Sequence, residues 1–184
     1  MSGYDPMAGF HEATPMLPHL AAEFLLWLWW SAASSGCRAD LGEELGVVDF
    51  WVDDRLAFRT PDEGRAAAVI TGENPAESPE ARAAIAGGKV LRELRLCIRR
   101  EEREFSVTLK APNLDLAQVS LPQVVTGDGE EALYDRMFLY EELHSLVAAF
   151  FQRFAQARST SDWGDATVPS IRSWVGERMV ALDG

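Results

Sequence analysis

Asp53 and Asp54 are the pair whose type and spacing most directly suggest chemistry, because they are adjacent carboxylates. Paired carboxylates hold divalent cations and serve as acid and base in hydrolases, provided that the fold brings further groups to them. Between two short apolar runs, however, the same pair is ordinary turn chemistry. A metal-dependent hydrolase using Asp53 and Asp54 is therefore the least favoured of three functional hypotheses.

The three histidines do not form a recognisable metal or catalytic pattern. His11 precedes Glu12, but the second histidine that a zinc-protease motif requires is missing. His19 and Glu23 are one helical turn apart without a third ligand, and His144 lies on an apolar helix stripe. No GxSxG, Walker A or GxGxxG motif occurs. The sequence therefore predicts no catalytic residue, no metal site and no cofactor.

A basic segment interrupts an otherwise acidic chain. The net charge is −12, whereas residues 89–110 carry seven basic and four acidic side chains. Spaced arginines on a strand could contact phosphates, and the candidate DNA-binding residues are Arg95, Arg99, Arg100 and Arg103. The alternative is a solvated sheet face on which these arginines pair with glutamates across strands.

The elements that must position these residues are strands and helices in an α+β order. Apolar and polar residues alternate over 90–99 and again over 105–110, which predicts an antiparallel hairpin. Runs at 47–52 and 56–60, joined by 53–55, predict another hairpin, and 66–71 a further strand. We therefore expect an antiparallel sheet of about five strands in two hairpins, packed with an N-terminal tryptophan-rich helix and two C-terminal helices.

Four segments have helical signals: 18–34, a short helix that follows Ser78 and Pro79, 128–158, and a last helix after Pro169. The first is apolar on every side, so it is either central in the core or shared with another subunit. The long helix carries a stripe at three- and four-residue spacing: Leu133, Met137, Tyr140, His144, Val147, Phe151 and Phe154. The candidate interface residues are Trp27, Trp29, Trp30, Phe150 and Phe151.

We expect residues 1–17 to form an irregular tail or arm and residues 18–184 to form a single domain. The apolar run around Trp27 is too short to span a bilayer and lacks the basic flank of a signal peptide. Cys37 and Cys97 are far apart and do not suggest a disulfide framework. These features predict a cytoplasmic protein that does not enter membranes.

Short motifs are distributed over roughly residues 18–180. They lie at 23–30 (EFLLWLWW), 51–56 (WVDDRL), 72–75 (GENP), 78–81 (SPEA), 88–90 (GKV), 103–109 (REFSVTL) and 121–122 (LP). Together they resemble the later part of RdgC-like recombination-associated proteins of bacteria. The resemblance implies a non-enzymatic, nucleoid-associated protein that forms dimeric rings around duplex DNA and restrains recombinase, with the earlier part of the family's chain absent here.

The favoured hypothesis is a non-enzymatic interaction or self-assembling protein, forming a homo-oligomer or binding a protein partner. It draws on the all-round apolar first helix, the wide stripe of the long helix and the acidic composition. The second hypothesis is weak, non-specific binding to duplex DNA in the control of recombination. A hydrolase is the third.

Overall fold

The computed structural model describes residues 18–60, 66–71, 77–123 and 129–176. Its centre is an antiparallel sheet in the order β1-β2-β4-β5-β6, with β3 pairing with the second half of β2. The strands are β1 (Arg38–Asp40), β2 (Val47–Arg59), β3 (Ala66–Thr71), β4 (Val90–Arg100), β5 (Arg103–Lys110) and β6 (Asp115–Ser120). The expected α+β class with an antiparallel sheet is confirmed.

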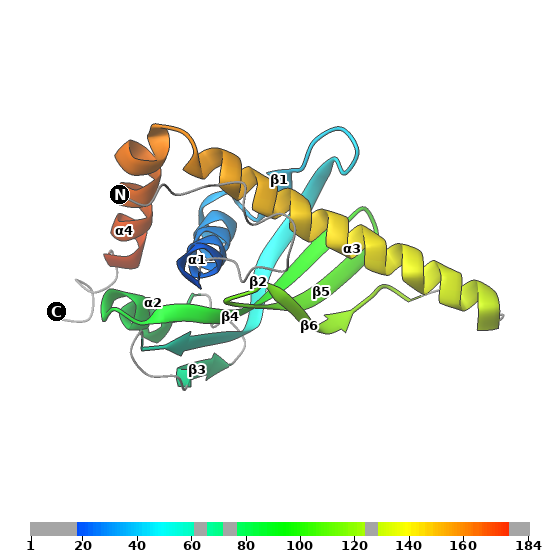
Figure 1. The fold of residues 1–184 in the computed structure, drawn as a ribbon, viewed down its shortest axis with the longest axis horizontal. Helices are drawn as coiled ribbons and strands as arrows, with labels where there is room; N and C mark the ends of the chain where they lie inside the picture. The colour runs from blue at the N-terminus through cyan, green and yellow to red at the C-terminus, as the bar shows by residue number, and fades with distance from the viewer. Residues whose placement is uncertain (1–17, 61–65, 72–76, 124–128, 177–184) are drawn as a thin grey trace, which may run out of the picture.

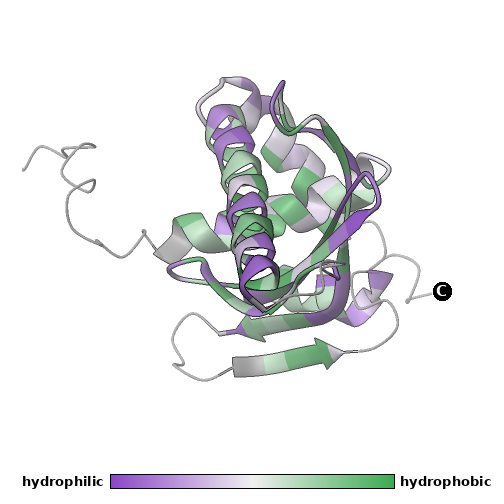
Figure 2. Ribbon diagram, turned by 90° about the vertical axis from the view of Figure 1, so that its right-hand side faces the viewer, coloured by the Kyte–Doolittle hydropathy of each residue, from purple (hydrophilic) through white to green (hydrophobic). Residues whose placement is uncertain are grey.

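The helices are α1 (Pro18–Ser34), α2 (Pro79–Ala86), α3 (Gly129–Arg158) and α4 (Val168–Gly176), and a π-helical turn, η2 (Trp163–Thr167), leads directly into α4. Figure 1 shows α1 and α3 on one side of the sheet, with α4 and α2 gathered at one end. In Figure 2 the strongly twisted sheet curves around these helices. All four predicted helices are confirmed, including Ser78 as the cap of α2. The predicted arm at residues 1–17 lies outside the described residues.

Alternation along the strands separates an apolar face from a polar one. The side chains that face the helices are fully buried, as Phe50, Leu96 and Val107 illustrate. Their neighbours Trp51, Cys97 and Ser106 lie on the opposite face, which the two long helices do not cover. The core is therefore a layer between the sheet and the helices, and in the described part of the chain neither α1 nor α3 covers the other face of the sheet.

Helix α1 is apolar all round because three elements surround it. Phe24 packs against Phe151 and Phe154 of α3, at ring distances of 5.2 and 5.5 Å. Trp29 packs on the other side against Trp174 of α4, with ring centroids 4.9 Å apart. The sheet covers the remaining side of α1. The sequence left two alternatives for α1, a central position in the core or contact with another subunit. The central position is sufficient to explain why α1 is apolar on every side.

The hairpin expected at 47–60 is wrong. β2 is one continuous strand of 13 residues, and it pairs with β4 on both sides of residues 53–55. Val52 pairs with Leu96 and Leu56 with Leu94, so three residues of β2 stand opposite Arg95 alone. This bulge keeps the chain in the sheet where a turn would have ended the strand, because the long strand β4 offers partners on both sides.

Candidate interaction surface

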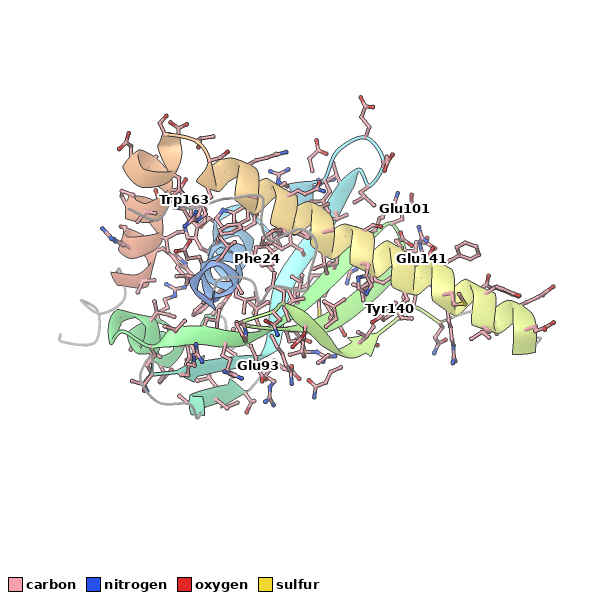
Figure 3. The ribbon with its side chains drawn as sticks, viewed as in Figure 1. Phe24, Glu93, Glu101, Tyr140, Glu141 and Trp163 are labelled. Atoms are coloured by element: carbon pink, nitrogen blue, oxygen red, sulfur yellow. The ribbon has the colours of Figure 1, made fainter. Side chains whose placement is uncertain are left out.

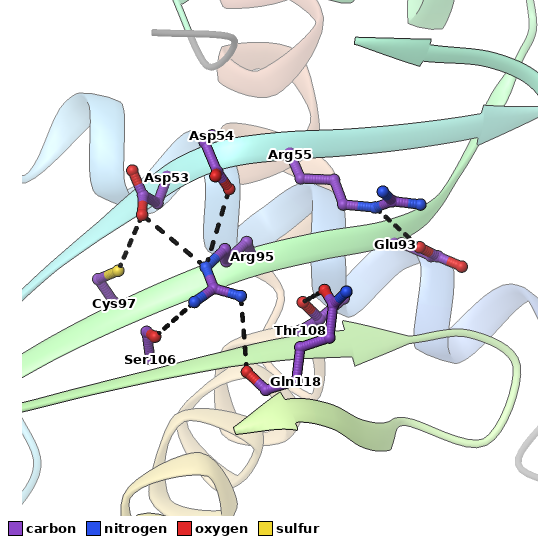
Figure 4. Close-up of polar contacts among 9 residues, drawn as sticks. All are labelled: Asp53, Asp54, Arg55, Glu93, Arg95, Cys97, Ser106, Thr108 and Gln118. Atoms are coloured by element: carbon purple, nitrogen blue, oxygen red, sulfur yellow. Dashed lines mark hydrogen bonds and ion pairs between the residues drawn. The ribbon is translucent and has the colours of Figure 1, made fainter. Parts of the chain in front are cut away.

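Arg95 is the centre of a polar network on the open sheet face (Figure 4). Its Nε lies 3.8 Å from a carboxylate oxygen of both Asp53 and Asp54, and an Nη donates to the Ser106 hydroxyl at 2.8 Å. The bulge of β2 explains this geometry, since it places both aspartates opposite one arginine. The charge of Arg95 is thus offset by two carboxylates within the same chain.

Cys97 completes the network from the neighbouring position on β4. Its thiol lies 3.6 Å from a carboxylate oxygen of Asp53 and is a weak donor to it. Burial, together with the negative charge of Asp53, raises the pKa of Cys97 to about 12. The thiol is therefore kept protonated and acts as a hydrogen-bond donor, not as a nucleophile.

The carboxylate pair that suggested a hydrolytic centre lies against an arginine of the same chain. Asp53 and Asp54 face a cation that the protein supplies itself. Across the described part of the chain, no three His, Cys, Asp or Glu side chains are grouped so that they could hold a metal ion. The arrangement joins β2, β4 and β5, and also β6 through the backbone carbonyl of Gln118, on the face that α1 and α3 do not cover.

The other three candidate DNA-binding arginines are also paired with carboxylates. Arg99 binds Glu104 at 2.9 Å and stacks over Trp51, with its guanidinium 5.1 Å from the ring centroid. Arg100 and Arg103 both bind Glu142 of α3, at 2.7 and 2.6 Å. The four candidates therefore do not form one surface: Arg95 and Arg99 lie on the open sheet face, and the other two clamp the β4–β5 turn onto α3.

The aromatic interface candidates fall into two groups. Trp27, Trp29 and Phe150 are buried within the chain, while Trp30 and Phe151 are half-buried. Phe150 packs against Phe50 of β2 at 4.8 Å between ring centroids. Contacts inside the molecule account for the three buried rings, so only Trp30 and Phe151 retain surface for a partner.

The largest exposed apolar side chains of α3 are elsewhere, on its first half. We call residues 129–141 the overhang, because Figures 1 and 3 show this part of α3 running away from α1 and past the strands. Tyr140 and Glu141 lie on it, whereas Phe24 and Trp163 lie at the opposite end of the molecule. Five large apolar side chains on the overhang are between 41% and 66% exposed: Leu133, Tyr134, Met137, Phe138 and Tyr140.

Sequence reasoning did not assign these five residues to an interface, although three of them belong to the stripe it identified. The stripe runs through the whole helix, and its second half is covered by α1 through Phe151 and Phe154. In its first half Leu133, Met137 and Tyr140 are exposed. The available signal was length: α3 has 30 residues and α1 has 17, so α1 is too short to cover the whole stripe.

A groove of about 620 Å³ lies beside the overhang. Its walls come from the end of β6 and the segment after it, including Val119 and Leu121, and from Ala132 and Arg136 of α3. Arg136 is a basic side chain at the margin of an apolar surface. The overhang and this groove together form the candidate interaction surface.

Comparison with protein-family models, with curated proteins and with solved structures returned no match. Among the helices that the structure describes, none has the combination of length and apolar character that crossing a bilayer requires.

Proposed function

We propose that this protein is a non-enzymatic interaction and assembly protein whose working surface is the overhang of α3. The observation that carries the proposal is the exposure of five large apolar side chains on one projecting half-helix: Leu133, Tyr134, Met137, Phe138 and Tyr140. Exposed apolar side chains gathered in one place, unlike scattered ones, mark interaction surfaces. Aromatic and methionine side chains are also the types enriched in protein interfaces.

The charge distribution supports a protein partner over a nucleic acid. The chain carries −12, and each of the four candidate DNA-binding arginines already has a carboxylate neighbour. Phosphates would have to compete with those carboxylates and with long-range repulsion. The resemblance to RdgC-like proteins is compatible with a non-enzymatic role, and a link to recombination is part of the proposal on that basis alone.

The proposal is tested by placing a photoreactive phenylalanine analogue at Phe138 in cells that make the protein. The matched control carries the analogue at Gln152, an exposed position on the second half of the same helix. We expect irradiation to join position 138, but not position 152, to a polypeptide that mass spectrometry identifies. If neither Phe138 nor Tyr134 gives a polypeptide adduct, the overhang is not an interaction surface and the proposal is wrong.

A further inference from the structure

Among the residues that the structure describes, no helix packs against the stripe of the overhang. Along the second half of α3, Phe151 and Phe154 pack against Phe24 of α1. Along the first half, the same stripe continues with Leu133, Met137 and Tyr140, which are exposed. A helix lying against these residues would bury the stripe along the first half of α3, as α1 buries it along the second half.

Building on the proposed function, we propose that this helix is the overhang of a second copy of the chain, packed antiparallel to the first. The stripe has the spacing of a coiled-coil seam, in which apolar residues alternate at four and three positions. Leu133 and Tyr140 occupy d positions of this heptad, and Met137 and His144 occupy a positions. An isologous pair uses one surface twice, so a single exposed stripe is sufficient to build it.

Four exposed side chains of the overhang lie on the paired side of this heptad: Leu133, Tyr134, Met137 and Tyr140. Phe138 is at a b position and lies outside the seam. A large side chain of this kind has about 200 Å² to bury, and these four are roughly half exposed. Each copy therefore offers about 400 Å², and a dimer would bury about 800 Å², the size of a weak, reversible interface. The groove next to Ala132 and Arg136 provides further surface beyond this amount.

Electrostatics favour the antiparallel orientation over the parallel one. Glu130 and Glu131 lie in the first turn of α3 and make its beginning acidic. A parallel pair would bring the two acidic ends together, whereas an antiparallel pair separates them and opposes the two helix dipoles. The net charge of −12 on each copy repels at long range, so the pairing should strengthen as salt screens that repulsion.

The heptad pattern fixes a register for the antiparallel pair. In such coiled coils an a residue of one helix packs in a layer with a d residue of the other. Met137 would then lie opposite Tyr140 of the partner subunit, and Leu133 opposite His144 of the partner subunit. Tyr134 and Glu141 share the e position, so the tyrosine hydroxyl of one copy would face the carboxylate of the other.

Cysteine cross-linking tests both the partner and the register. In a Cys37→Ser background, which removes the exposed native thiol, three proteins are compared: Met137→Cys with Tyr140→Cys, Met137→Cys alone, and Gln152→Cys as the control. We expect mild oxidation to join only the double variant rapidly into a covalent dimer. Rapid dimer formation by Met137→Cys alone would show a parallel pair and overturn the proposed geometry.

Sedimentation equilibrium of the unmodified chain supplies the second readout. We expect a reversible dimer whose dissociation constant rises about tenfold or more in Met137→Glu and stays unchanged in Gln152→Glu. Met137 is half-exposed in the monomer, so its replacement leaves the fold intact, which circular dichroism verifies. A chain that stays monomeric while the photoreactive group at Phe138 captures a different protein would overturn the second copy as partner and leave the proposed function standing.

Discussion

At the scale of single residues, the polar groups that suggested chemistry form one network that joins neighbouring strands. Arg95 faces Asp53 and Asp54 at 3.8 Å and binds Ser106, and Asp53 also accepts from Cys97. The network joins four neighbouring strands, β2, β4, β5 and β6, on the sheet face that neither α1 nor α3 covers.

The two cysteines should react very differently with alkylating reagents. Cys37 is exposed, whereas Cys97 is buried and its pKa is raised to about 12, so almost none of it is thiolate at neutral pH. We expect iodoacetamide to modify one thiol in the native protein and two in denaturant, as counted by mass spectrometry. The Cys37→Ser variant should have no rapidly reacting thiol, and two rapid reactions in the native protein would contradict this assignment.

At the scale of secondary-structure elements, Glu142 joins the sheet to the helix layer. Its carboxylate accepts from Arg100 at 2.7 Å and from Arg103 at 2.6 Å, and its side chain is only 13% exposed. Arg100 also donates to the backbone carbonyl of Glu44, at 3.0 Å. Glu142 therefore fixes the β4–β5 turn against α3, directly after the last residue of the overhang.

Glu142→Gln should destabilise the protein measurably. The substitution removes the charge from two short hydrogen bonds in a mostly buried setting, where loss of a charged partner costs about 1–3 kcal/mol of unfolding free energy. The matched control is Glu102→Gln, an exposed glutamate of the β4–β5 turn itself, for which we expect a change within about 0.5 kcal/mol. Urea denaturation compares the two, and equal stabilities would show that the clamp contributes nothing.

The elements differed in how far the sequence predicted them. α1 and β4 followed from local patterns, an uninterrupted apolar helix and a strict alternation, because each pattern was long enough to specify one structure. The continuity of β2 through residues 53–55 did not follow from the local sequence, because Asp-Asp-Arg has the composition of a turn. The strand continues because β2 pairs with β4, which is distant in the sequence. β1 and β6 were missed because a three-residue strand and a polar edge strand carry almost no periodic signal.

The candidate site was predicted only in part, for a related reason. The stripe through Leu133, Met137 and Tyr140 is visible in the sequence, but periodicity identifies a face and not the element that covers it. The tryptophans are interface candidates because the helix that carries them is apolar on every side, yet Trp29 is fully buried within the chain. Which part of the long helix is exposed depends on where α1 ends in space.

At the scale of the whole molecule, charge is the property with the broadest consequence. Each copy carries −12, and the basic segment at 89–110 faces carboxylates from other parts of the chain, namely Asp53, Asp54 and Glu142. Arg95 and Arg99 are the two residues to substitute in a test of the DNA hypothesis, because they share the sheet face that the long helices leave uncovered.

We expect no binding to duplex DNA at physiological ionic strength, measured by fluorescence anisotropy with a labelled duplex. Repulsion from the net charge acts at long range, and no guanidinium of Arg95, Arg99, Arg100 or Arg103 lacks a carboxylate neighbour. Binding that weakens with salt and disappears in Arg95→Glu with Arg99→Glu would contradict this expectation and restore the DNA hypothesis.

The clamp at Glu142 has a geometric consequence for assembly. The overhang is a helical segment of 13 residues, about 20 Å long at 1.5 Å per residue, and Glu142 is the next residue after it. If the helix tilted by about 10° at Glu142, the first residue of α3 would move by about 3 Å, more than half of one helical turn. In the proposed dimer, the angle between the copies would depend on the Glu142 clamp inside each copy, so the shape of the assembly could change without any change at the surface where the copies meet.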